Sequence, residues 1–145
     1  MNVPGNNLNS IPIKVDDTEQ YSIGSLRAIL SEMATHLEKL AQDGTTGSIN
    51  LNSLPFAPGE YDQLRLLLGE GEVKAHIEAL GPSDIVETRY PGVWWVTHYN
   101  VEGDIVADSI EITTIPELLK SQPEDIDMGL ELIKAQLNDE VQNDQ

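Results

Sequence analysis

The chain has 145 residues, with 25 acidic side chains against 8 basic ones, a formal net charge of −17 and no cysteine. A negative field of this strength repels phosphate polymers and anionic membrane surfaces, so neither nucleic acids nor membranes are expected as partners. The lack of cysteine excludes disulfides, thiolate catalysis and cysteine-bound metal, and together with the absence of a signal-peptide pattern it favours the cytoplasm.

The first half of the chain is expected to be mainly helical. Residues 1–21 show little periodicity and predict an irregular arm. From Ile23 to Leu40, apolar residues recur every three or four positions, which is the spacing of one helical stripe, and Gly44 is placed to end this helix. Alternation over residues 48–53 indicates a strand, and proline and glycine at its two ends favour a short helix between residues 58 and 69.

Strands dominate the second half. Residues 72–80 alternate between apolar and charged side chains, which predicts a strand buried on one face. Three more strands are expected over residues 85–90, 93–100 and 105–112, and the short turns between them make antiparallel neighbours. A last helix is expected to begin at a capping-box pattern, Ser121 to Glu124.

The order of these elements predicts an α+β fold. We expect an antiparallel sheet of four to five strands, connected as a meander, with helices packed on one face. The length fits a single domain, placed at residues 22–138 between the irregular arm and a frayed tail at residues 139–145.

Two glutamates, Glu70 and Glu72, are separated by one glycine in the stretch Leu66 to Val73. A carboxylate pair can transfer protons or bind a hard metal ion. Acids are frequent in this chain, however, and the plainer interpretation is a solvated loop between a helix and a strand. A third interpretation is a loop that binds a partner.

The three histidines are candidate metal ligands because nickel and zinc favour imidazole. Glu72 and His76 lie on one strand face but about 13 Å apart at the rise of a strand, too far to share an ion. His98 could join His76 only if the strand register brought them together, and His36 fits the edge of the first helix's stripe. No closed ligand shell results, so no metal or cofactor is expected. A nickel or iron carrier, or a small metal-dependent enzyme, using Glu70, Glu72, His76 and His98 stays as an alternative.

Trp94 and Trp95 are adjacent in an expected strand, and adjacent side chains of a strand point to opposite faces of the sheet. One ring therefore belongs in the core. The other is either exposed, where it could anchor a protein partner, or buried beneath a second covering segment. The sequence leaves both interpretations open.

Three stretches resemble the HupH/HyaF family of hydrogenase expression proteins. They are LLGEGEV at Leu67–Val73, ETRYPGVW at Glu87–Trp94 and the segment 110–119, and the resemblance extends over residues 51–119. It implies an accessory protein of [NiFe] hydrogenase maturation that acts in the cytoplasm as a chaperone or scaffold, not an enzyme. The implied partner is the large-subunit precursor or another maturation protein, and a homodimer is left open.

The chain has no phosphate-binding loop, dinucleotide-binding loop or serine-nucleophile motif, and the resemblance supplies no catalytic residue. The motif positions are therefore carried over as an expected protein-interaction surface, with one tryptophan as its apolar anchor. These positions are Glu70, Gly71, Glu72, Glu87, Thr88, Pro91, Gly92, Trp94 and Trp95. The charge alone admits another function, an acidic nucleic-acid mimic that blocks a basic protein, which requires acids at DNA-like spacing over one surface.

Overall fold

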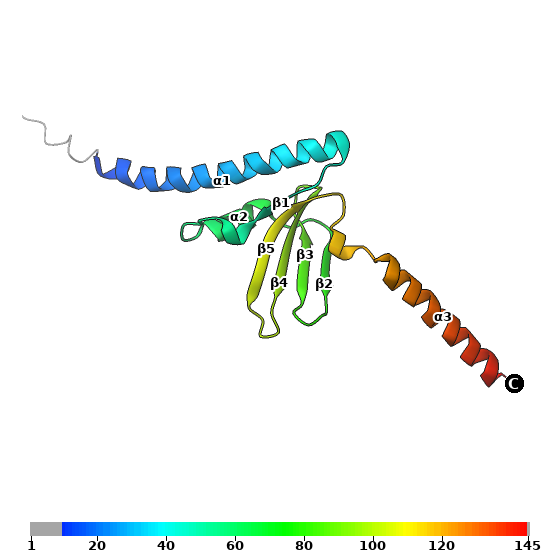
Figure 1. Ribbon diagram of the computed structural model, residues 1–145. Helices are drawn as coiled ribbons and strands as arrows, with labels where there is room; N and C mark the ends of the chain where they lie inside the picture. The colour runs from blue at the N-terminus through cyan, green and yellow to red at the C-terminus, as the bar shows by residue number, and fades with distance from the viewer. Residues whose placement is uncertain (1–9, 145) are drawn as a thin grey trace, which may run out of the picture. The chain divides into compact units, whose positions relative to one another are not determined.

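The computed structural model describes the backbone of residues 10–144 and the side chains of residues 24–144 (Figure 1). Contacts divide the chain into two compact units, residues 1–114 and 115–145. In chain order the elements are α1 (Ser10–Asp43), β1 (Gly47–Asn50), η2 (Leu51–Ser53), α2 (Glu60–Leu68), β2 (Lys74–Ile77), β3 (Ser83–Glu87), β4 (Val93–Tyr99), β5 (Ile105–Ile112), η3 (Glu117–Leu119) and α3 (Pro123–Asn143).

The five strands form one antiparallel sheet in the order β1-β5-β4-β3-β2. Strands β2 to β5 follow one another as a meander, and β1 pairs with β5 at the far edge. The predicted α+β class is confirmed, as is the antiparallel sheet.

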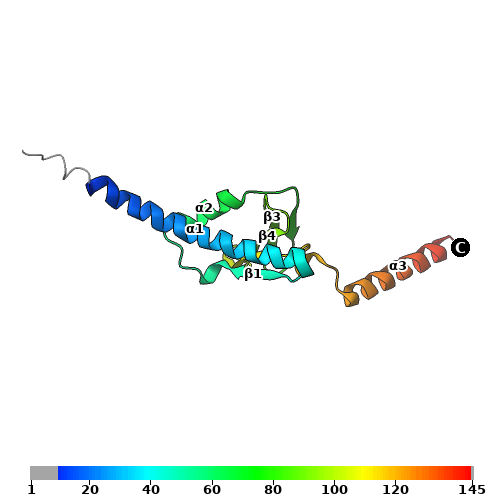
Figure 2. The same cartoon turned by 90° about the horizontal axis from the view of Figure 1, so that it is seen from above.

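The core of the first unit lies between the sheet and two helices. Figure 2 shows α1 running across the sheet with α2 beside it. Met33 of α1 and Leu64 and Leu68 of α2 are buried in one cluster with Trp95 and Ile110 of the sheet. Because full burial of a leucine side chain contributes roughly 1.5–3 kcal/mol, this cluster fixes α2 and the loop that follows it to the sheet.

Helix α1 is longer than the sequence pattern predicts. Its backbone is helical from Ser10, so residues 10–21, expected as part of an irregular arm, belong to the helix; residues 1–9 lie outside the described residues. Pro12 is compatible with this because it lies in the first turn, where backbone N–H groups have no partner inside the helix. The expected end is confirmed: the Gly44 N–H donates to the Leu40 carbonyl oxygen at 3.0 Å.

Other boundaries differ by a few residues. The segment after Asn50, expected to continue the strand, turns into η2 because the Asn50 side chain accepts the Asn52 N–H. The expected capping box at Ser121 is wrong: Gln122 precedes the helix, without a side-chain cap. Helix α3 continues to Asn143, beyond the expected start of a frayed tail. The single domain at residues 22–138 stays a prediction.

Among the described residues, none of the helices combines the length and the apolar character needed to cross a membrane.

Candidate functional site

The two motif segments that the sequence singles out meet in the structure. The loop after α2, residues 69–72 (the GEGE loop), lies against the end of β3 and the turn that follows it, residues 88–92 (the β3–β4 turn). The Gly71 N–H donates to the Glu87 carbonyl oxygen at 2.7 Å, and the Arg89 N–H donates to the Leu68 carbonyl oxygen at 2.8 Å. A third bond runs from the Glu72 N–H to the Glu87 carboxylate at 3.1 Å. The two segments, whose motif positions are expected to form one surface, therefore lie in direct contact.

Gly71 is required by this joint. A Cβ atom at position 71 would lie 2.6 Å from the Thr88 carbonyl oxygen and 2.8 Å from Glu87 Oε2, closer than real Cβ contacts allow. Gly69 has a positive φ of 61°, a backbone conformation that side chains other than glycine's disfavour. Both glycines thus explain how the loop can lie flat on β3.

Thr88 holds the β3–β4 turn from inside. Its side chain is 1% exposed, and its hydroxyl donates to the Val93 carbonyl oxygen at 2.9 Å while accepting the Tyr90 N–H at 3.2 Å. Gly92 completes the turn with φ 90°, and a Cβ there would lie 3.2 Å from Leu37 of α1. Thr88 and Gly92, both expected in the interaction surface, thus set the conformation of the turn. They offer little contact area of their own.

Three carboxylates surround one open cavity at the joint. Glu70, Glu72 and Glu87 line a cavity of about 490 Å³ together with Arg89 and Pro91. Glu70 also forms an ion pair with Lys74, 2.6 Å between Oε2 and Nζ, and this hydrogen bond lowers the pKa of Glu70.

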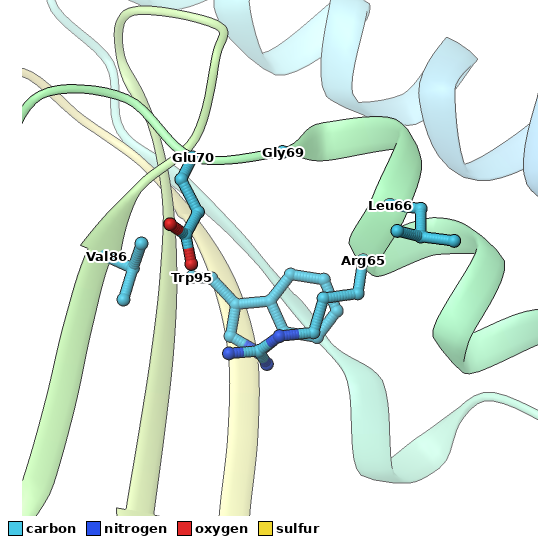
Figure 3. A pocket seen from close by; sticks show the side chains of 6 residues that line it. All are labelled: Arg65, Leu66, Gly69, Glu70, Val86 and Trp95. Atoms are coloured by element: carbon cyan, nitrogen blue, oxygen red, sulfur yellow. The ribbon is translucent and has the colours of Figure 1, made fainter.

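A second cavity of about 220 Å³ adjoins the first and is mainly apolar. It lies between α2 and the sheet, with Trp95 and Val86 on the sheet side and Leu66, which is 77% exposed, on the helix (Figure 3). The Arg65 guanidinium lies 4.7 Å from the centroid of the Trp95 ring, within cation–π range. Glu70 lines both cavities, so the two belong to one candidate site.

Trp95 is fixed by a buried hydrogen-bond cluster. Its ring N–H donates to Asp108 Oδ1 at 2.7 Å, and the Thr97 hydroxyl donates to the same oxygen at 2.9 Å. The Tyr61 hydroxyl donates to the other oxygen of Asp108, and the Tyr61 ring meets Trp95 edge-on at 5.4 Å. Burial, followed by the hydrogen bond to Asp108, raises the pKa of Tyr61 to about 12. No sequence motif marks this cluster, because its members come from three separate elements.

Both tryptophans are buried, at 5% exposure for Trp94 and 3% for Trp95. They lie on opposite faces of β4, as the alternation predicts, and the Trp94 ring N–H donates to the Thr113 carbonyl oxygen at 3.1 Å. The interpretation with an exposed indole is therefore wrong: β4 is a central strand of the sheet, and its residues 93–97 are all buried. Trp95 remains reachable only as the floor of the second cavity.

The strand register separates the histidines. His76 pairs with Asp84, and His98 pairs with the neighbouring Ser83, which places the two imidazoles on opposite faces of the sheet. His76 Nδ1 lies 2.6 Å from Asp84 Oδ1, and this hydrogen bond raises the pKa of His76. The ligand set of the metal alternative therefore does not assemble, and in the described part of the chain no three ligating side chains are grouped to hold an ion.

Basic residues gather at the site despite the acidic composition. Arg65 and Arg89 line the two cavities and Lys74 pairs with Glu70. The surface is thus of mixed charge, which does not match the uniform array of acids required of a nucleic-acid mimic.

Comparison with known proteins identifies relatives. The family model described as HupH hydrogenase expression protein, C-terminal conserved region, matches residues 24–139. The chain is 32% identical over 106 residues to the hydrogenase expression/formation protein HoxQ of Azotobacter vinelandii, covering 73% of this chain and 37% of the relative. It is 36% identical over 84 residues to the hydrogenase expression/formation protein HupH of Rhodobacter capsulatus, covering 58% of this chain and 30% of the relative. The chain thus spans about a third of the length of these curated relatives.

A solved structure is also similar, the hydrogenase expression protein HupH from Thiobacillus denitrificans. The sequence identity is 36% and the TM-score 0.77, over 80% of this chain and 97% of that chain.

Proposed function

Because the chain belongs to the HupH family of hydrogenase expression proteins, we propose that it is a non-enzymatic accessory protein of [NiFe] hydrogenase maturation. In this proposal it works in the cytoplasm as a chaperone or scaffold. It binds the precursor of the hydrogenase large subunit or another maturation protein.

The observation that carries the proposal is the joint between the GEGE loop and the β3–β4 turn. It places three carboxylates around one cavity and an apolar cavity directly beside them. An apolar centre with a polar, charged border is the usual composition of a protein-binding surface. The backbone bonds of Gly71 and the buried hydroxyl of Thr88 hold the surface in place, so little conformational entropy is lost on binding.

The residues at this surface divide into two roles. Glu70, Glu72, Glu87 and Pro91 can contact the client directly, since none of them is buried. An exposed indole was expected to supply the apolar contact area of this surface. The exposed Leu66 and the cavity above Trp95 supply it instead. Electrostatic complementarity mainly sets the association rate and the specificity, so the acids suit a basic patch on the client.

The test is a binding titration of purified large-subunit precursor with the full chain. A Glu70→Gln, Glu72→Gln variant should weaken binding by about tenfold, mainly through slower association at low salt. The matched control is Glu38→Gln, Glu102→Gln, which removes the same charge from exposed positions outside the site. If the two variants bind alike, the surface is misassigned.

A further inference from the structure

The second unit contains an amphipathic helix whose apolar side chains are exposed. Helix α3 is a single uninterrupted helix of 21 residues (Figure 1). Five of its apolar residues follow at intervals of four, three, four and four positions, which places them along one side of the helix. This α3 stripe consists of Ile126, Leu130, Ile133, Leu137 and Val141, which are 50–62% exposed.

An exposed stripe of this kind requires a reason. Helices in water gain most of their stability by packing an apolar face, and exposed contiguous apolar surface marks interaction sites. Within residues 115–145 the structure shows no buried residue in α3. The stripe therefore has no packing partner inside its own unit.

Gly129 adds a feature of shape to the stripe. It lies three residues after Ile126 and four before Ile133, and so on the same side of the helix. Its φ is not positive, so the backbone does not need glycine, and a Cβ there would meet nothing within 4 Å. Glycine weakens a helix interior relative to alanine. Its presence here leaves a notch where another chain can approach the helix axis closely.

Charge decides between the occupants of this face. Helix α3 carries six acids and one base, Lys134. A second copy of this net negative helix, or the remainder of a chain with net charge −17, would meet it with charge of the same sign. An apolar groove bordered by lysine or arginine would instead complement both the apolar stripe and the negative charge of the helix.

We propose that α3 is a docking helix that inserts its stripe into an apolar, basic-bordered groove on the immature hydrogenase subunit. This is the helix-in-groove mode of recognition. The inference rests on the proposed function, because it assumes the same client. It adds a second contact between the chain and that client. Two contacts on one chain strengthen binding because the second forms at a high effective concentration.

The experiment compares variants of the full chain in titrations of purified large-subunit precursor. Leu130→Gln with Ile133→Gln should weaken binding by about tenfold or more. Met128→Gln with Leu132→Gln is the matched control: these side chains are exposed at 62% and 65% but lie off the stripe, and binding should stay within about twofold of the wild type.

Gly129→Ala gives a second, independent readout. It should raise the helix content or the thermal midpoint of α3, because alanine favours the helix, and at the same time weaken binding by filling the notch. A merely structural role for the helix would move binding and stability in the same direction.

The outcomes are distinguishable. If the stripe variant binds like the wild type while Glu70→Gln, Glu72→Gln binds weakly, the docking helix is refuted and the proposed function stands. If only the stripe variant loses binding, the docking helix is supported and the site at the GEGE loop is misassigned. If the wild type does not bind the precursor, both proposals fall.

Two further readouts test the other occupants. Sedimentation that shows a dimer for the wild type and a monomer for the stripe variant, with unchanged precursor binding, would make the stripe a self-association surface. Both tryptophans lie in the first unit, so their fluorescence follows the unfolding of that unit alone. A lower midpoint in the stripe variant would show that α3 packs on its own chain, and would overturn the proposal.

Discussion

The Gly71 N–H donates to the Glu87 carbonyl oxygen at 2.7 Å, with no space for a side chain between the two segments. This bond joins a loop that follows α2 to the last residue of β3. Because of it, the carboxylates of Glu70 and Glu72 lie beside that of Glu87 around one cavity. The relative position of these three acids therefore depends on position 71.

Gly71→Ala should destabilise the first unit. The added methyl group would lie 2.6 Å from the Thr88 carbonyl oxygen, and relieving such overlap costs about 1–3 kcal/mol of unfolding free energy. Urea denaturation followed by tryptophan fluorescence measures the loss. Gly24→Ala in α1 is the control, since a Cβ there meets nothing, and should leave stability equal or slightly higher. Equal stability of both variants would show that the joint tolerates a side chain.

The raised pKa of Tyr61 predicts a loss of folding stability at high pH. Its pKa is raised from 10.0 to about 12 by burial and by its hydrogen bond to Asp108, so the folded state retains the proton longer than the unfolded state. The resulting stabilisation is complete below pH 10 and is lost as the pH rises from 10 to 12. Denaturation at a series of pH values should show a smaller loss in Tyr61→Phe than in wild type. Tyr90→Phe, whose hydroxyl is not bonded to Asp108, should behave like wild type; identical profiles for all three proteins would refute the assignment.

Metal binding should be absent at stoichiometric level. The register places His76 and His98 on opposite faces of the sheet, and His76 is already bonded to Asp84. Equilibrium dialysis with nickel, iron and zinc at micromolar concentration is therefore expected to give no stoichiometric retention. Retention of one ion per chain that His76→Ala abolishes would restore the metal-carrier alternative.

Much of the sheet could be predicted because its signals are local. The alternation in residues 72–80 and the short turns after β3 and β4 define neighbouring antiparallel strands without knowledge of the core. The start of α1 could not be predicted in this way. Pro12 and the acids Asp16 and Asp17 favour an irregular segment, whereas proline is compatible with the first turn of a helix.

The site was predictable only in part. That the GEGE loop and the β3–β4 turn belong to one surface was expected from a resemblance, and Gly71 explains how the two segments come into contact. Whether Trp94 or Trp95 was exposed depended on what covers each face of β4, which alternation does not specify. Arg65 was missed for a similar reason: helical spacing puts it one turn before Gly69, but only the packing of α2 brings it over Trp95.

The most direct test of the central claim is carbodiimide labelling of carboxylates, with and without purified large-subunit precursor, read by mass spectrometry. The account predicts that the precursor protects Glu70, Glu72 and Glu87, which line the cavity at the joint, while the exposed Glu38 and Glu102 label as before. Equal labelling of all five carboxylates in the bound and free protein would contradict it.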